Sequence, residues 1–548
     1  MLLRDTHSPT GIHPVSQSKA AWRAMRAGRP LQVLGRPRMA FTTSKAATFP
    51  STQSLEDPLT TTQDHSSAKH STEVEREVEQ ETYDWAKQWY PLAFVEDLDP
   101  KVPHPVELLG ERLVLWRDAD KQWRCFQDKC PHRLAPLSEG RIEPSDGTLM
   151  CSYHGWRFDG EGKCTDIPQS LDAKANAAAC SNPRSCAISH PTQVLQGKVW
   201  VFGEGGSRAF IDSAAVKPAL LEDLEDTYPP REKNGGEDCF FAGGHYARDL
   251  PYAWSTLMEN LADPSHVNFS HHNVVGDRTV DQTMKIVSKE PSKTVPSIKD
   301  TFKMAVTSFD DKARDYQTFD MEFVAPCLVK WGIPPWGVGI KHGYMPMYMI
   351  PTGPGRSKIL WCMLLPTSSM PAPAKLMQRL TPKWLQHISI TPQVLDGDTG
   401  LLHGQEVAVS KEAEKDLNRL YYMPAQADRF VAAYRKWLAG RGGGGPLPMP
   451  ETSELQAQPQ LLDRYSQHTQ NCPSCSRAVQ VFTALRIVTA ALAAVCAMGI
   501  ASTLAASHPV LGLPAQFAAG GIVLAGAWLW LSKTIQKYYY VPHTHAHA

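Results

Sequence analysis

Two short segments that contain cysteine and histidine constrain this chain more than any other feature. Cys130-Pro-His132 and Cys151-Ser-Tyr-His154 each place one thiol close to one imidazole, in segments that the sequence predicts as loops. The region around them, residues 83–202, has short apolar runs separated by Gly and Pro, which predicts a small all-β domain. Two such loops on one β scaffold can bring four ligands to a shared metal centre.

These four side chains are the ligand set of a Rieske [2Fe–2S] cluster, in which two thiolates bind one iron and two imidazoles bind the other. Zinc is the rival, because two Cys and two His also suit a tetrahedral site. The spacing differs from that of a zinc finger, since each loop contributes one Cys and one His, and Gly155-Trp156 follows the second histidine. We therefore predict that the cluster ligands are Cys130, His132, Cys151 and His154.

A second candidate centre lies further along, in the segment that runs from Asp263-Pro-Ser-His266 to His271-His272. Two imidazoles and a distant carboxylate form the facial triad of non-haem iron, which leaves positions open for O₂. We predict that His266 and His271 bind a mononuclear Fe(II), with His272 as the alternative to His271. A cluster that gathers single electrons needs such a site to use them.

The third ligand of this iron is predicted in Asp396-Gly-Asp398. We favour Asp398, because its position seven residues before Gln405 resembles the ligand region of Rieske oxygenases. Asp396 is the alternative, and a solvated Asp-Gly-Asp turn would be the interpretation without iron.

The 548 residues are too many for one core, so the sequence predicts two folded domains with appendages. Lys plus Arg equals Asp plus Glu at 56 each, which gives no indication of a nucleic-acid partner. Residues 1–55 are poor in acidic residues and contain Arg and Ser, as in a chloroplast transit peptide. The other predicted parts are a linker (56–82), a Rieske domain (83–205), a catalytic domain (206–440), a linker with the Cys472-Pro-Ser-Cys475 pair (441–485), a membrane segment (486–532) and a tail (533–548).

The membrane segment contains no charged residue from Ile487 to Ser532. Its two apolar stretches, 487–506 and 511–531, are each long enough to cross a bilayer. Arg486 precedes them and Lys533 follows, which predicts a transmembrane hairpin with both ends on the positive side. A buried helical hairpin in a soluble protein is the alternative.

The chain resembles the pheophorbide a oxygenase family of chloroplast membrane Rieske oxygenases. The residues that carry the resemblance include Trp89-Tyr-Pro, Cys130-Pro-His-Arg-Leu-Ala-Pro-Leu-Ser-Glu-Gly-Arg141, Cys151-Ser-Tyr-His-Gly-Trp, Phe323-Val-Ala-Pro-Cys327 and Leu462 to Cys472. Cys472-Pro-Ser-Cys475, just before the apolar pair, belongs to the same pattern and argues against chlorophyllide a oxygenase, whose iron motifs are similar.

The resemblance implies an α+β fold, in which the Rieske all-β domain precedes a helix-grip catalytic domain. It implies a ferredoxin-dependent monooxygenase that uses O₂ to open the macrocycle of pheophorbide a, giving red chlorophyll catabolite. Such enzymes are usually homotrimers in the inner envelope or thylakoid membrane, with the catalytic domains facing the stroma. Alternatives are another tetrapyrrole oxygenase of the family, a pure electron carrier, or a redox-sensing membrane scaffold or translocon component.

Two further roles follow for single residues. Asp263 stands three residues before His266, so its carboxylate could accept the free N–H of that ligand and also bind His154 of a neighbouring subunit. Cys472 and Cys475 have the spacing of a dithiol that cycles to a disulfide, and the resemblance suggests regulation by thioredoxin. Idle thiols are the alternative; a zinc site would need two more ligands, and in the sequence only His468 is near.

Overall fold

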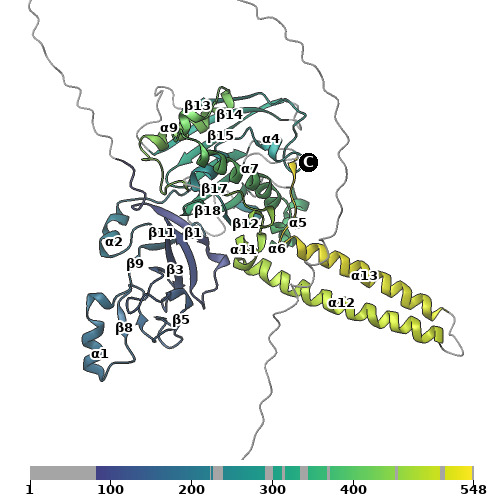
Figure 1. Ribbon diagram of the computed structural model, residues 1–548, viewed down its shortest axis with the longest axis horizontal. Coiled ribbons are helices and arrows are strands. Elements are labelled where there is room, and N and C mark those ends of the chain that lie inside the picture. The colour runs from purple at the N-terminus through teal and green to yellow at the C-terminus, as the bar shows by residue number, and fades with distance from the viewer. Residues whose placement is uncertain are drawn as a thin grey trace, which may run out of the picture. The chain divides into compact units, whose positions relative to one another are not determined.

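Figure 1 shows a computed structural model of the chain. The structure describes residues 82–221, 224–225, 239–289, 300–310, 315–333, 343–366, 371–450, 454–505 and 512–545. The predicted transit peptide, residues 1–55, and all but the last residue of the predicted linker, residues 56–82, lie outside the described residues.

The N-terminal domain consists of three small antiparallel sheets. The first has the order β1-β11-β10, with β1 Trp89–Phe94, β10 Thr192–Leu195 and β11 Lys198–Phe202. The second has the order β2-β3-β4-β9, with β2 His104–Leu108, β3 Glu111–Arg117, β4 Trp123–Gln127 and β9 Ser189–His190. The third runs from β5 to β8, with β5 Arg141–Ile142, β6 Leu149–Met150, β7 Arg157–Phe158 and β8 Cys164–Asp166. Two helices accompany them, α1 Ala173–Cys180 and α2 Ser207–Ala214.

The second domain is built on a seven-stranded antiparallel sheet with the order β12-β18-β17-β16-β15-β14-β13. Its strands are β12 Cys239–Leu250, β13 Met284–Ser288, β14 Thr301–Asp310, β15 Asp315–Val324, β16 Leu328–Ile333, β17 Gly343–Gly353 and β18 Arg356–Pro366. Its helices are α3 Trp254–Leu261, α4 Val267–Ser270, α5 Ala372–Leu380, α6 Lys383–His387, α7 Thr391–Lys411, α8 Leu417–Leu420 and α9 Arg429–Ala439.

The long helix α7 lies against this sheet and supplies part of its core (Figure 1). Leu395 and Leu402 of α7 belong to the same buried cluster as Met347, Met349 and Ile359 from β17 and β18. Burial of such side chains contributes about 1.5–3 kcal/mol each, so this contact fixes α7 on the sheet. The arrangement holds the middle of α7 in place for the site described below.

The β domain packs on the catalytic sheet through a second apolar cluster, separate from the one that contains α7. Trp89 and Val199 from the β1–β11 pair are buried together with Leu328, Tyr348 and Leu360 from β16, β17 and β18. Because these side chains are almost fully excluded from water, the first sheet of the β domain is held against the catalytic sheet.

The C-terminal part begins with the short helices α10 Gln458–Leu461, α11 Arg464–Gln467 and η6 Thr469–Asn471. Two long antiparallel helices follow, α12 Pro473–Ala505 and α13 Leu513–Gln536 (Figure 1). Both are long and apolar enough to cross a membrane. Away from the start of α12 and the end of α13, many of their apolar side chains are exposed: Ile487 is 64 % exposed and Ile522 is 73 % exposed.

The first helix of this pair starts earlier than the predicted span at residue 487, because the first turns of α12 are part of the protein core. Cys475, Val479 and Phe482 are buried there against Leu531 and Ile535 of α13. With this hairpin, the predicted fold class is confirmed: an all-β domain, then an α+β domain with a sheet around a long helix, then two apolar helices.

Candidate metal centres

The two loops predicted to hold the cluster have the same backbone pattern. The amide of Cys130 donates to the carbonyl of Ala135 at 2.8 Å, and the amide of Cys151 donates to the carbonyl of Trp156 at 2.9 Å. The fourth residue after each cysteine, Leu134 or Gly155, donates back to the cysteine carbonyl. Both of these residues have positive φ, 59° and 76°, so each loop is a tight turn around its cysteine.

The side chains of these loops separate into a buried thiol pair and an outer imidazole pair. Cys130 and Cys151 are buried in one apolar cluster, and the thiol of Cys130 donates to Cys151, which holds the pKa of Cys151 below its ordinary value. The rings of His132 and His154 have centroids 4.6 Å apart, and Trp156 stacks on His132 at 4.7 Å. Nδ1 of His132 is buried without a hydrogen-bond partner in the described structure, which suits an atom that binds metal.

A single ion would need all four ligand atoms around one point. Within the described residues, two groups of potential ligands have atoms that all lie within 4.8 Å of one another, and the Cys130, His132, Cys151 and His154 set is not one of them. A [2Fe–2S] cluster binds the thiolates and the imidazoles through different irons, so it tolerates this separation. The donor set therefore fits the cluster better than it fits one zinc ion.

The structure brings His266, His271 and Asp398 together, with ligand atoms within 4.8 Å of one another. Nε2 of His271 lies 3.4 Å from Asp398 Oδ2, and Nε2 of His266 lies 3.8 Å from Asp398 Oδ1. The two histidines flank α4, and the aspartate comes from the buried middle of α7. Two nitrogens and one carboxylate that converge from one side match the facial triad of mononuclear iron.

Asp263 orients the first of these histidines. Its backbone carbonyl, rather than its carboxylate, accepts the hydrogen bond from His266 Nδ1, which leaves Nε2 unprotonated; this nitrogen accepts from Asn260 Nδ2 at 3.5 Å and has the lone pair that can bind metal. The carboxylate Oδ1 accepts from the amide of Ser265 at 2.8 Å, and Oδ2 lies 4.0 Å from His266 Nδ1. One carboxylate oxygen therefore caps the turn, and the other remains beside the histidine.

The sequence alternatives for this centre lie elsewhere. Nδ1 of His272 accepts from the amide of Arg278 at 3.2 Å, and this ring is not part of the convergent group. Asp396 is buried between two guanidinium groups that sequence reasoning did not find: Arg248 Nη1 donates to it at 2.7 Å and Arg464 Nη2 at 2.6 Å. Its two oxygens are thus occupied by charge-assisted hydrogen bonds.

Gly397 permits the close approach of α7 to the second histidine. A Cβ at this position would lie 3.2 Å from His271 Nδ1 and 3.2 Å from the carbonyl oxygen of Ser270. We predict that Gly397→Ala displaces the His271 ring and weakens iron binding about tenfold, the size of effect seen for groups that orient metal ligands. Iron content after dialysis against a weak chelator measures this.

Gly400→Ala is the matched control, because a Cβ at Gly400 of the same helix would meet nothing within 4 Å. Alanine is the better helix former by about 1 kcal/mol, so this variant should keep its iron and be no less stable. Equal iron retention in the two variants would contradict the steric role of Gly397.

The predicted dithiol lies in the second convergent group. Cys472 and Cys475 are buried with His468, and a fourth side chain that the sequence analysis missed, His387, completes the group. His387 is 81 residues from His468, so local spacing gave no signal for it.

Comparisons with known proteins give the family of the chain. The family profile of the Rieske [2Fe-2S] domain matches residues 88–176, and the profile of pheophorbide a oxygenase matches residues 323–416. Chloroplastic pheophorbide a oxygenases of Oryza sativa subsp. japonica and Arabidopsis thaliana are 35 % and 37 % identical; the matches cover 87 % and 75 % of this chain and 88 % and 76 % of theirs.

Other similar proteins are named for other substrates. A chloroplastic flavonoid 8-hydroxylase 2 of Ocimum basilicum is 30 % identical over 87 % of this chain and 88 % of its own. Among solved structures, dicamba monooxygenase bound to dicamba aligns with a TM-score of 0.48 at 17 % identity, over 66 % of this chain and 99 % of that one.

Proposed function

The chain belongs to the pheophorbide a oxygenase family of Rieske oxygenases, and from this premise we propose that it opens the macrocycle of pheophorbide a with O₂, giving red chlorophyll catabolite. The observation that carries the substrate is the identity of 35 % and 37 % with two pheophorbide a oxygenases over most of the chain. The flavonoid hydroxylase is the less similar relative at 30 %.

We assign the cluster to Cys130, His132, Cys151 and His154, and the mononuclear iron to His266, His271 and Asp398. When bound, the cluster supplies single electrons and the iron supplies the position at which O₂ reacts. The protein orients these groups. The carbonyl of Asp263 sets the tautomer of His266, and Gly397 makes room for His271.

The proposed oligomer is a homotrimer in which the cluster of one subunit reduces the iron of its neighbour. Two exposed apolar side chains at the tips of the cluster loops support a covered surface there: Leu134 is 69 % exposed and Tyr153 is 62 % exposed. The ring of Tyr153 lies against His154, with centroids 3.9 Å apart. Reduced ferredoxin is the proposed electron donor, and Asp263 is the proposed acceptor of the N–H of the neighbouring subunit's cluster ligand.

The proposed location is a chloroplast membrane, the inner envelope or the thylakoid. The relatives are named chloroplastic, and the exposed apolar faces of α12 and α13 would be covered by lipid. Arg486 precedes the apolar stretch within α12 and Lys533 follows the apolar stretch of α13, which favours a stromal catalytic domain by the positive-inside rule. An apolar macrocycle partitions into lipid, so a membrane-anchored enzyme would meet its substrate there.

The substrate assignment predicts the outcome of a competition. Full-length enzyme in detergent, with ferredoxin and its reductase, should convert pheophorbide a to an open-chain product and leave chlorophyllide a, protochlorophyllide, a bilin and a flavone unchanged. Each compound is supplied alone and in a mixture, and the products are separated and identified by mass spectrometry. Conversion of another compound, with pheophorbide a untouched, would refute the substrate but leave the oxygenase class intact.

A further inference from the structure

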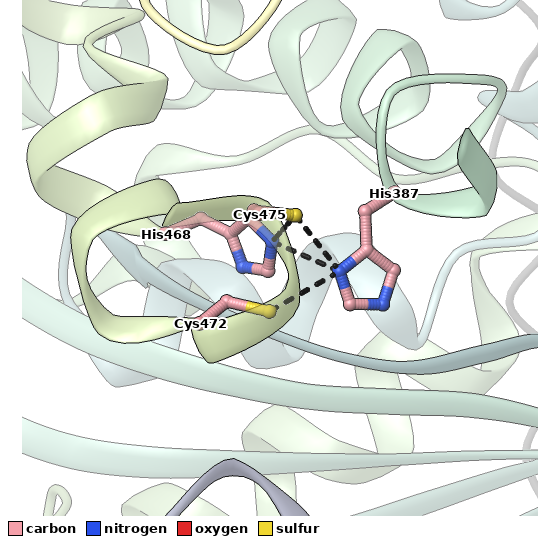
Figure 2. A group of neighbouring side chains, drawn as sticks. All are labelled: His387, His468, Cys472 and Cys475. Carbon is pink, nitrogen blue, oxygen red and sulfur yellow. Dashed lines mark hydrogen bonds between the residues drawn. The ribbon is translucent and has the colours of Figure 1, made fainter. Parts of the chain in front are cut away.

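A second group of metal-binding side chains lies at the base of the apolar helix pair, apart from both iron centres. Figure 2 shows His387 and His468 pointing toward Cys472 and Cys475 from separate segments of the chain. His387 comes from the end of α6, His468 precedes η6, and the two cysteines stand at the start of α12. All four side chains are buried.

Four separations between their ligand atoms are close to the edges of a tetrahedron around one ion. Nδ1 of His387 lies 3.6 Å from Cys472 Sγ, 3.4 Å from Cys475 Sγ and 3.1 Å from His468 Nε2. Sγ of Cys475 lies 3.4 Å from His468 Nε2. With zinc–sulfur bonds of about 2.3 Å and zinc–nitrogen bonds of about 2.0–2.1 Å, a regular tetrahedron has edges of about 3.3–3.8 Å.

The contacts around the two imidazoles leave Nε2 of His468 and Nδ1 of His387 available to bind a metal. Nδ1–H of His468 donates to the carbonyl of Ala247 on β12 at 2.7 Å, so its Nε2 carries a lone pair toward the cysteines. Tyr246 stacks on this ring at 4.3 Å and meets the His387 ring edge-on at 5.2 Å, which fixes both orientations. Nε2 of His387 has no partner among the described residues, so the ring contacts the group through Nδ1 alone.

The charges of such a site balance. Binding of Zn²⁺ releases the two thiol protons, and two thiolates with two neutral imidazoles give a neutral complex. The first turn of α12 adds the positive end of a helix dipole beside the thiolates. Four protein ligands also leave no open position, which is typical of a structural site rather than a catalytic one.

We propose that His387, His468, Cys472 and Cys475 form a closed tetrahedral Zn²⁺ site. The donor set is the same as in the cluster loops, but the geometry differs. Here all ligand atoms lie within 4.8 Å of one another, whereas those of Cys130, His132, Cys151 and His154 do not. The first arrangement fits one ion, and the second fits two irons.

The site joins the catalytic domain to the membrane helices. It connects α6 and α12, and through the hydrogen bond of His468 it connects them to β12. Arg464, four residues before His468, binds Asp396 of α7, the helix that carries Asp398. Zinc binding would therefore fix the anchor relative to the helix of the mononuclear iron.

The ion can enter from a groove of about 1110 Å³ between the β domain, β12 and the start of α12. His468 and Cys472 line this groove, whereas the three proposed iron ligands do not. Cys472 and Cys475 cannot form a disulfide and bind zinc at the same time, so the two roles can be distinguished.

The test is the metal content of the full-length enzyme, purified in detergent under reducing conditions without chelator. We expect about one zinc per chain beside about three irons. X-ray absorption at the zinc edge should show two sulfur ligands at about 2.3 Å and two nitrogen ligands at about 2.0–2.1 Å. His387→Ala and Cys475→Ala should lower the zinc content to background and keep the iron of the cluster.

Cys496→Ser is the control, because this cysteine lies on α12 outside the group. It should retain zinc. Wild-type enzyme that lacks zinc and binds no stoichiometric Zn²⁺ on titration would overturn the proposal, as would equal zinc in His387→Ala. A Cys472–Cys475 disulfide in enzyme isolated without zinc would assign the pair to redox regulation instead. Because these readouts do not involve turnover, they are independent of the proposed substrate.

Discussion

Replacement of Asp398 by alanine is expected to remove the mononuclear iron and abolish oxygenation. The carboxylate is one of three groups that converge on this centre, and it is the only anion among them. Loss of groups that merely orient a ligand costs about 10–100-fold, so loss of the ligand itself should lower the rate by more than about 100-fold. Iron should fall from about three to about two per chain, with an unchanged cluster signal in electron paramagnetic resonance.

Asp396→Asn is the matched variant, because this residue stands two positions earlier on the same helix. Its carboxylate binds Arg248 and Arg464, so the change breaks a buried charge network and should destabilise the fold by about 3–5 kcal/mol. The variant should nevertheless keep its mononuclear iron at low temperature. If Asp396→Asn loses the mononuclear iron and Asp398→Ala retains it, Asp396 is the iron ligand and Asp398 is not.

Replacement of Asp263 by asparagine is expected to stop electron transfer while both iron centres stay loaded. Asparagine retains the oxygen that accepts from Ser265, and the backbone carbonyl still accepts from His266. The substitution removes the negative charge beside His266 Nδ1 and the proposed hydrogen bond to the cluster ligand of the neighbouring subunit. Reoxidation of the reduced cluster in a single turnover should slow by about 100-fold or more.

Ser265→Ala tests whether the charge of Asp263 or the turn that it caps controls electron transfer. The variant removes a hydroxyl bonded to Asp263 and leaves the carboxylate in place. The rate of cluster reoxidation should then stay near that of the wild type. If Asp263→Asn also reoxidises at the wild-type rate, Asp263 is a structural residue. If both variants slow equally, the cap and not the charge controls the transfer.

The cluster loops could be predicted from sequence because their pattern is local. Each Cys and His pair lies within one turn, and the strands beside them show short apolar runs that do not depend on distant residues. The histidines beside α4 could be predicted for the same reason. Their convergence with Asp398 needed a resemblance to known ligand regions, because the carboxylate lies in another part of the chain.

The helix that carries Asp398 was not predicted. The segment around Asp396-Gly-Asp398 has glycines at positions 397, 400 and 404, each of which disfavours a helix by about 1 kcal/mol relative to alanine. Burial of Leu395 and Leu402 against the sheet outweighs this cost. The tertiary contact thus decides the structure, and only the fold shows why Gly397 is needed next to His271.

The fourth member of the C-terminal group was missed for a related reason. His387 is near neither cysteine in the sequence, and the packing of α6 against the start of α12 brings it there. An isolated histidine in a sequence gives no indication of a partner 81 residues away. The sequence therefore predicted a redox-regulated dithiol with His468 nearby, whereas the fold adds His387 to the group.

The central claim is that both iron centres act together on pheophorbide a, and a single-turnover experiment with ¹⁸O₂ tests it most directly. Enzyme reduced with ferredoxin is mixed with pheophorbide a without oxygen and then exposed to one pulse of ¹⁸O₂. We predict a ring-opened product that contains ¹⁸O, formed as the cluster becomes oxidised. Oxidation of the cluster with pheophorbide a unchanged and no ¹⁸O in any organic product would contradict the account and indicate an electron carrier.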